Sequence, residues 1–370
     1  GGRWSTPINW STRRVPGPDD HVYIGPLPAG TPVTITGGEV RIASLVSDHD
    51  LVLGAGVLDV ATTSTVSATF AMNGGTLAGA GDFVVTGTLA WRGGRMAGPA
   101  RTLATGSVTL GGQFAGSVRL DGGRVFENRG SAVWLNGHIV LNERLDRGAG
   151  RLINAAGATF EIRAVNYGME AASHGDADDG SDALFHNLGT ITSSTTGAAT
   201  ISAPFDNQGT LDIAAGRLAL EGKGTLGGTV DVAAGATLFF GVGDYLVEGP
   251  SFRTCPGLIV VGGGAVVDLA GPLAMEGTLE LRGGTLNTNS AISAVRYRQD
   301  GGRLAGSGDL HASDELAWIS GEMAGPGRTV SSGTLALLGL AKVIYLDAGR
   351  VLENRGAAVW KSGCMSLQRD

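Results

Sequence analysis

Helical periodicity is what this sequence of 370 residues lacks most clearly. It contains no amphipathic stretch of a dozen residues in which apolar positions recur three and four apart. No apolar run reaches the ~18 residues that a membrane-spanning helix needs, so we expect no such helix. Only three residues are lysine, and the formal net charge is −7. Since phosphate binding needs clustered positive charge, nucleic acid is excluded as a partner.

Proline and cysteine are also scarce, with 12 and 2 residues. The few prolines, without a strict Gly-X-Y period, exclude collagen. Cys255 and Cys364 are 109 residues apart in the sequence. In a stack of ~20-residue coils spaced ~4.8 Å apart, this separation far exceeds the ~7 Å that a disulfide allows. The two cysteines pair only if the C-terminal tail folds back, and otherwise they are free thiols.

Glycine is abundant, with 63 residues, and this excess points to many turns. A hydrophobic content of 42% with only 16% charged residues argues against disorder. The remaining composition is rich in valine, leucine and threonine, which are typical of short strands separated by tight turns. Gly1 falls in mid-pattern, as expected for a mature or trimmed segment.

A short repeat defines the architecture. Segment 209–216, Gly-Thr-Leu-Asp-Ile-Ala-Ala-Gly, recurs at 228–235 as Gly-Thr-Val-Asp-Val-Ala-Ala-Gly. A unit of this size cannot bury its own apolar face, whereas coiling successive units stacks like residues into one core. The sequence therefore predicts an all-β fold, a right-handed parallel β-solenoid (β-helix) with rungs of about 19–20 residues. At that rung length, the chain holds roughly 18 rungs.

Asparagine recurs at one position of the rung, in an apolar-x-Asn-x-Gly pattern. Asparagine tolerates the left-handed backbone of a corner, and its amide can bond to the same position one rung away. We therefore predict inward-facing corner asparagines, in preference to ligand-binding ones, at Asn128, Asn187, Asn207 and Asn354.

A second repeat, of about 227 residues, is a tandem duplication. Segment 74–82 matches 301–309, and segment 123–130 matches 349–356. We call the two versions copy one and copy two. The predicted organisation is an N-terminal cap (1–30), a first solenoid module (31–257) and a truncated second copy (258–370).

The last ten residues, 361–370, match no rung of copy one, and only Met365 and Leu367 offer apolar cover for the last layer. An uncovered end exposes unpaired strand groups. We expect either further modules beyond this point or head-to-tail self-association at this end, a contact that need not close into a ring.

The repeats resemble a known class. The opening Trp4, Asn9-Trp10, Val15-Pro16 and 20–24 (Asp-His-Val-Tyr-Ile), the stretch 205–218 and the stretch 234–241 are similar to Gly-rich β-solenoid repeats of large bacterial surface proteins, the filamentous-haemagglutinin-like or autotransporter-like adhesins. The similarity covers most of the chain and is specific for architecture. It implies surface display or secretion, and it carries over no catalytic residues.

Segment 173–182 is the most acidic stretch and interrupts the rung pattern. Its carboxylates around a glycine have the composition of a Ca²⁺ loop, since Ca²⁺ takes six to eight oxygens. The alternative is a solvated acidic loop. Neighbouring His174 and His186 lack the spacing that defines a zinc site. The candidate Ca²⁺ ligands are Asp176, Asp178, Asp179 and Asp182.

Parallel β-helices also carry polysaccharide-cleaving sites, which use paired carboxylates or a basic side chain. An active site is normally built once, whereas a structural ion pair is copied with its rung, so duplicated residues argue against catalysis. The duplicated tryptophans are either stacking platforms for sugars or core residues, and we favour the core. The duplicated pairs are Asp82/Asp309, Glu127/Glu353, Arg129/Arg355, Trp91/Trp318 and Trp134/Trp360.

These observations predict an extracellular structural or adhesive segment without catalysis: an adhesin stalk, filament component or spacer, secreted or displayed at the cell surface. Its partners would be cell-surface or matrix glycans or proteins, and it would need no cofactor except Ca²⁺ if the acidic segment binds it. The alternative is a carbohydrate-active enzyme or carbohydrate-binding module on the same fold. That alternative predicts one groove lined by charged residues that are not repeated.

Overall fold

Stacked parallel strands make up most of the described chain. The computed structural model describes residues 1–28, 30–112, 116–143, 148–173, 180, 182–248, 252–339 and 343–367. With 57% strand and 1% helix, it is a parallel β-solenoid of about 16 turns, which confirms the predicted all-β solenoid. The turns are fewer than the 18 expected because some rungs are long. Asn128 and Asn154 occupy the same position of successive rungs yet are 26 residues apart, and Asn187 follows after another 33.

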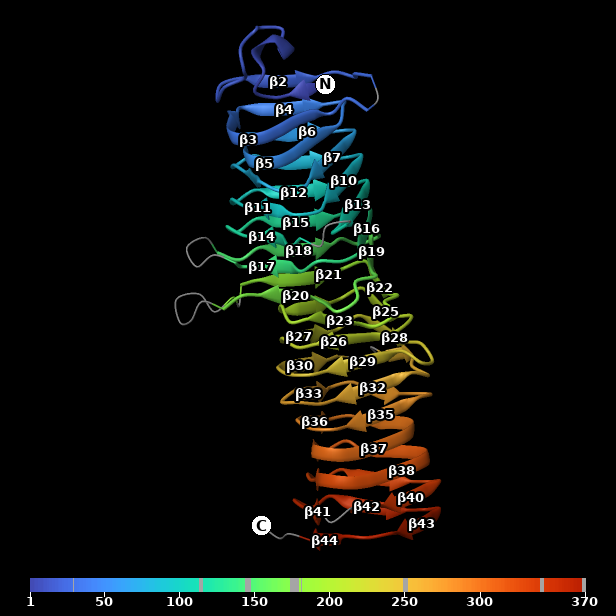
Figure 1. Cartoon of the computed structure of the whole chain (residues 1–370). Coiled ribbons are helices and arrows are strands. Elements are labelled where there is room, and N and C mark those ends of the chain that lie inside the picture. The colour runs from blue at the N-terminus through green and yellow to red at the C-terminus, as the bar shows by residue number, and fades with distance from the viewer. Residues whose placement is uncertain are drawn as a thin grey trace. The chain divides into compact units, whose positions relative to one another are not determined.

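The chain divides into two compact units, residues 1–191 and 192–370, with β22 (Thr190–Ser193) at the division. Figure 1 shows successive coils within each unit. The domain boundaries expected from the duplication, at residues 30 and 257, stay a prediction.

In the first unit, three parallel ladders run along the coil. The first contains β2 (His21–Ile24), β4 (Ser44–Ser47), β6 (Ser64–Val66), β9 (Phe83–Val85), β12 (Arg101–Ala104), β15 (Val125–Asn128), β18 (Arg151–Asn154) and β21 (Leu184–Asn187). The second contains β1 (Gly2–Arg3), β3 (Val33–Ile42), β5 (Leu51–Val60), β7 (Thr69–Met72), β10 (Thr88–Trp91), β13 (Ser107–Leu110), β16 (Ser131–Trp134) and β19 (Thr159–Ile162). The third, the groove ladder, contains the second halves of β3 and β5, then β8 (Thr76–Ala78), β11 (Gly94–Met96), β14 (Val118–Leu120), β17 (Ile139–Leu141) and β20 (Tyr167–Ala171).

In the second unit, the long strands β37 (Ile292–Ala305) and β38 (Leu310–Met323) turn through three sets of strands. One set is β25 (Thr210–Ile213), β28 (Thr229–Val232), β31 (Phe252–Thr254), β34 (Leu273–Ala274), β39 (Arg328–Ser331) and β42 (Val351–Asn354). Another is β23 (Ala198–Ile201), β26 (Arg217–Leu220), β29 (Thr237–Phe240), β32 (Leu258–Val261), β35 (Thr278–Leu281), β40 (Thr334–Leu337) and β43 (Ala357–Trp360). The last is β24 (Phe205–Asn207), β27 (Gly224–Leu226), β30 (Asp244–Val247), β33 (Val266–Leu269), β36 (Thr285–Thr288), β41 (Val343–Leu346) and β44 (Cys364–Leu367).

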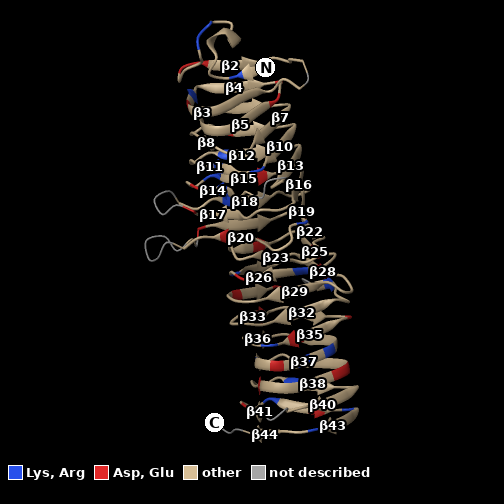
Figure 2. Ribbon diagram, viewed as in Figure 1, with Lys and Arg blue, Asp and Glu red and all other residues tan. Residues whose placement is uncertain are grey.

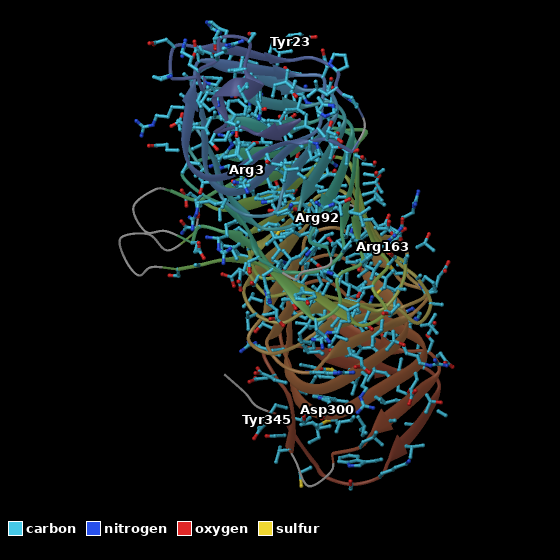
Figure 3. The ribbon with its side chains drawn as sticks, turned by 45° about the horizontal axis from the view of Figure 1, so that its top comes forward. Arg3, Tyr23, Arg92, Arg163, Asp300 and Tyr345 are labelled. Carbon is cyan, nitrogen blue, oxygen red and sulfur yellow. The ribbon has the colours of Figure 1, made fainter. Side chains whose placement is uncertain are left out.

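The core lies inside the coil, because side chains alternate in and out along each strand. Phe70, Leu89 and Val108 are in register on successive rungs, and all three are buried. Outward positions stay in contact with solvent. Figure 3 labels Tyr23 and Arg163, and both side chains are more than half exposed.

Some corners admit only glycine. Gly79 has a φ of +105°, and a Cβ there would lie 2.1 Å from the carbonyl oxygen of Val60 in the rung before it. Side chains other than glycine's rarely adopt this backbone conformation, and the close contact would force the two rungs apart. The abundant glycine of the sequence therefore sets how closely rungs can stack at their corners.

The opening of the chain packs against the first coils. β1 pairs with β3, and β2 pairs with β4. Trp4 is 1% exposed and meets Trp10 edge to face, with ring centroids 4.8 Å apart. The 3₁₀ turn η1 (Pro7–Asn9) lies between these two tryptophans in the sequence. The described residues contain no helix with the length and apolar character needed to cross a bilayer.

The final residues depart from the sequence prediction. Segment 361–370 was expected to match no rung, but β44 pairs in parallel register with β41 and extends its ladder. Met365 is half-buried there, and Leu367 is 69% exposed. The strand was missed because copy one offers no similar sequence at this point.

Candidate functional site

The predicted Ca²⁺ ligands fall mostly outside the described residues. Asp176, Asp178 and Asp179 lie there, as does His174. Asp182 is described, and its Oδ2 accepts a hydrogen bond from the amide of Ala149 at 3.2 Å. Among the described residues, no three His, Cys, Asp or Glu side chains cluster as metal ligands would. The Ca²⁺ site stays a prediction.

The two cysteines are free thiols. Cys255 is buried, and burial raises the pKa of its thiol to about 12. Cys364 is exposed on β44. A thiol with a raised pKa carries little thiolate at neutral pH, so Cys255 is not a reactive nucleophile.

The duplicated carboxylates pair with arginines in the same way in both copies. Arg101 Nη2 lies 3.0 Å from Asp82 Oδ2, and in copy two Arg328 Nη2 lies 2.6 Å from Asp309 Oδ2. The Arg328 guanidinium, donating to Asp309, lowers the pKa of that carboxyl. One rung farther along the coil, a glutamate in each copy pairs with the arginine two residues after it. The distances are 2.6 Å for Glu127–Arg129 and 2.7 Å for Glu353–Arg355.

Two buried arginines reinforce the same rungs. Arg124 is fully buried, and its guanidinium donates to Thr102 Oγ1 at 2.9 Å and to the carbonyl oxygens of Ala97 and Arg101. Burial lowers its pKa to about 10, so it remains charged at neutral pH. Sequence reasoning missed this residue, because an arginine in a strand repeat is normally assigned to the surface.

Copy two repeats this arrangement around Arg350. Its guanidinium donates to Thr329 Oγ1 at 3.0 Å and to the carbonyl oxygens of Gly306 and Arg328. The sequence contained one signal for these buried arginines, the Gly-Arg-Val that precedes the asparagine corner in both copies. Contacts copied with their rungs are structural in character.

The predicted asparagine ladder is present. Asn128, Asn154 and Asn187 stack on successive rungs, fully buried, with amide-to-amide hydrogen bonds of 2.8 Å at each step. Asn207 is also buried. Asn354 is in register with the buried Ser331 and therefore stands at an inward position, as predicted. It is exposed because no described rung follows β42, and its amide bonds only to the carbonyl oxygen of Gly356.

Most of the duplicated tryptophans are core residues, as favoured. Trp91, Trp134 and Trp318 are at most 1% exposed, which rules out a role in stacking on sugars. Trp360 is 58% exposed. It differs from its partner Trp134 because no described rung follows β43 along its ladder.

A hollow of about 510 Å³ lies on the groove ladder of the first unit, across β3, β5, β8 and β11. We call it the copy-one groove. Small residues form part of its lining, and charged side chains stand along it. The small residues are Thr76, Ala78 and Gly79, and the charged ones are Glu39, Arg41, Asp59 and Arg95.

The arginines of the copy-one groove are paired with carboxylates. Arg41 Nη2 lies 2.6 Å from Glu39 Oε1. Arg95 contacts both Asp121, which is fully buried, and Glu143. In Figure 2 the basic and acidic positions of this unit are interspersed along the ribbon.

Glu143 closes this ion-pair network, because Arg119 Nε also donates to its Oε1 at 2.6 Å. Burial raises the pKa of Glu143, but Arg119 and Arg95 outweigh burial and lower it overall. Glu143 therefore stays ionised at neutral pH, and its contacts help to fix the Arg95 side chain.

Asp59 is different from these residues. Its carboxylate makes no hydrogen bond or ion pair with any part of the chain that the structure describes. A carboxylate carries about four acceptor positions, so this one is available to a ligand that donates hydrogen bonds.

The equivalent positions of copy two hold different residues. The ladder register places Arg303 where copy one has Thr76, and Glu322 where it has Arg95. Arg303 Nη1 lies 3.4 Å from Glu322 Oε1. Asn287 pairs with Ala305 as Asp59 pairs with Ala78, so it stands at the position of Asp59, and it donates to Asp268 at 2.5 Å. In copy two, these polar side chains are partnered with one another.

Comparison with known proteins gives no relative: no protein-family model, curated protein or solved structure matches the chain. The resemblance to bacterial surface adhesins is therefore supported only in its architecture, the β-solenoid repeat.

Proposed function

We propose that the chain is an extracellular structural and adhesive segment, secreted or displayed at a cell surface. Its scaffold would hold a binding surface away from its point of attachment. Its partners would be glycans or proteins of a cell surface or matrix. Ca²⁺ would join it only if the acidic segment binds the ion.

The observation that carries this proposal is the copying of whole contact sets between the two copies. The Asp82–Arg101 pair recurs as Asp309–Arg328, and the cage around Arg124 recurs around Arg350. An enzyme would have such charged residues at a single active site, whereas here they form ion pairs and hydrogen bonds between neighbouring rungs in both copies. A module duplicated with its fastenings is typical of a repetitive scaffold, in which each repeat contacts only its neighbours.

Adhesion by the isolated chain tests this proposal. Beads coated with folded chain are applied to surfaces carrying matrix proteins, glycoproteins or polysaccharides, with beads coated with heat-unfolded chain as the control. We expect retention on at least one surface by folded chain alone. If no surface retains the folded chain more than the unfolded control, the adhesive part of the proposal is wrong.

A carbohydrate-active enzyme is the second candidate, and the copy-one groove is the observation that favours it. Its charged lining is not repeated in copy two, and one carboxylate, Asp59, has no partner in the described chain. The test is release of reducing ends from a panel of polysaccharides. Release that disappears in Asp59→Asn would establish the enzyme and displace the adhesive proposal.

A further inference from the structure

We propose that the copy-one groove binds an uncharged oligosaccharide, with Asp59 as the acceptor for its hydroxyl groups. This inference rests on the adhesive part of the proposed function and specifies where the ligand binds and what its chemistry is. Its starting point is the polar hollow of about 510 Å³ on β3, β5, β8 and β11. That volume falls within the ~300–1,000 Å³ of ordinary small-molecule sites.

The charges of the groove select against an acidic ligand. Arg41 is neutralised by Glu39, and Arg95 by Asp121 and Glu143, so neither guanidinium offers an unbalanced positive charge. The unpaired carboxylate of Asp59 repels an acidic glycan. Adjacent hydroxyl groups satisfy a carboxylate well, because each donates a charge-assisted hydrogen bond.

Arg95 supplies the complementary donors. A guanidinium has five N–H groups in a fixed fork. The contacts of Arg95 with Asp121 and Glu143 use one hydrogen each from Nη1 and Nη2. The remaining N–H groups are held in place by the ion-pair network and can donate to hydroxyl or ring oxygens. Acceptor and donors thus stand on opposite sides of the groove.

The spacing of these groups suits a sugar ring. Asp59 is on β5 and Arg95 on β11, and the ladder places β8 between these two strands. Two steps of ~4.8 Å separate the rungs by about 10 Å. The residues of β8 that line this interval, Thr76 and Ala78, have short side chains, so a ring can approach the strand closely.

In copy two, the equivalent surface is occupied by side chains that pair with one another. Arg303 replaces Thr76 and extends to Glu322, while Asn287 replaces Asp59 and bonds to Asp268. The binding function therefore belongs to copy one, and two single substitutions carry copy-two residues into it: Thr76→Arg and Asp59→Asn. Both positions are on the outer surface, so these variants should fold.

The experiment measures binding of the whole chain to immobilised uncharged polysaccharides, and to glycoproteins before and after enzymatic removal of their glycans. Those two arms distinguish a free polysaccharide from a protein-borne glycan. We expect Asp59→Asn to weaken binding about tenfold, the effect of losing charge-assisted hydrogen bonds. Thr76→Arg should weaken it at least as much by occupying the groove. Thr229→Arg, an outward threonine on β28 of the second unit, is the matched control and should bind as the parent chain does.

The outcomes separate this inference from the proposed function. Binding of an uncharged glycan that survives both groove variants, with melting temperatures unchanged, would overturn the groove while leaving adhesion intact. Binding only to acidic glycans or to deglycosylated proteins would also overturn the inference and still support adhesion. Binding abolished by a chelator and unaffected by Asp59→Asn would assign the ligand to a metal-dependent site elsewhere and reject this one. If the chain bound no surface at all, the proposed adhesive function itself would fail.

Discussion

Substitution of Asn154 by alanine is the sharpest test of how the rungs are fastened together. Asn154 lies in the middle of the buried amide ladder. Its Nδ2 donates to Asn187 Oδ1 at 2.8 Å and to the carbonyl oxygen of Thr190 at 3.2 Å, while its Oδ1 accepts from Asn128 Nδ2 at 2.8 Å. Alanine removes all three bonds. At about 0.5–1.5 kcal/mol each, the free energy of unfolding should fall by about 2–4 kcal/mol.

The chain contains a matched control for this substitution. Asn354 occupies the same motif position but is exposed, and its amide bonds only to the carbonyl oxygen of Gly356 at 2.8 Å. Asn354→Ala should cost less than about 1 kcal/mol. Urea unfolding with an unchanged m-value provides the comparison, and hydrogen exchange should place the lost protection in the rungs next to residue 154.

Equal losses of stability in the two variants would refute this reasoning. That result would mean that the buried amides contribute no more than a solvent-exposed turn. A loss of protection spread evenly over the chain would contradict the nearest-neighbour character expected of a solenoid.

Three further predictions concern the duplicated residues. Arg124→Met should lower the free energy of unfolding by about 2–4 kcal/mol in denaturant titrations, because buried acceptors lose their donor. Trp134→Ala should cost about 3–5 kcal/mol and Trp360→Ala less than 1, since the first is buried and the second 58% exposed. Because Arg328 lowers the folded-state pKa of Asp309 from its ordinary value of 3.8, this pair stabilises the fold above about pH 4 and is lost as the pH falls further. Melting temperatures measured from pH 2 to 6 should therefore drop less steeply for Asp309→Asn than for the parent chain.

Much of the fold was predictable, because a solenoid repeats its own sequence. The recurring asparagine required only that like positions stack, and this predicted the buried amides of Asn128 and Asn187. The duplicated acids and arginines were correctly expected to be ion pairs for the same reason. The exposure of Asn354 was not predictable, because it depends on whether a further rung covers this position, and the repeat pattern does not contain that information.

The candidate site was less predictable. Arg124 is buried among backbone oxygens whose positions depend on the register of neighbouring rungs. The sequence does not reveal that register, so the residue type alone, arginine, suggested a surface position. The copy-one groove arises where Thr76 lies between rungs carrying Asp59 and Arg95. Those neighbours are 17 and 19 residues away, and only the strand register brings them together. The difference between Thr76 and Arg303 was visible in the duplication, but its meaning depends on that register.

The most direct test of the central claim, a scaffold that binds glycans without cleaving them, is light scattering during size-exclusion chromatography of the chain mixed with a polysaccharide that retains it. The account predicts that the 37.4 kDa chain co-elutes with the polymer and that the polymer's mass stays constant over prolonged incubation. A polymer mass that falls with time, or a chain that always elutes alone, would contradict it.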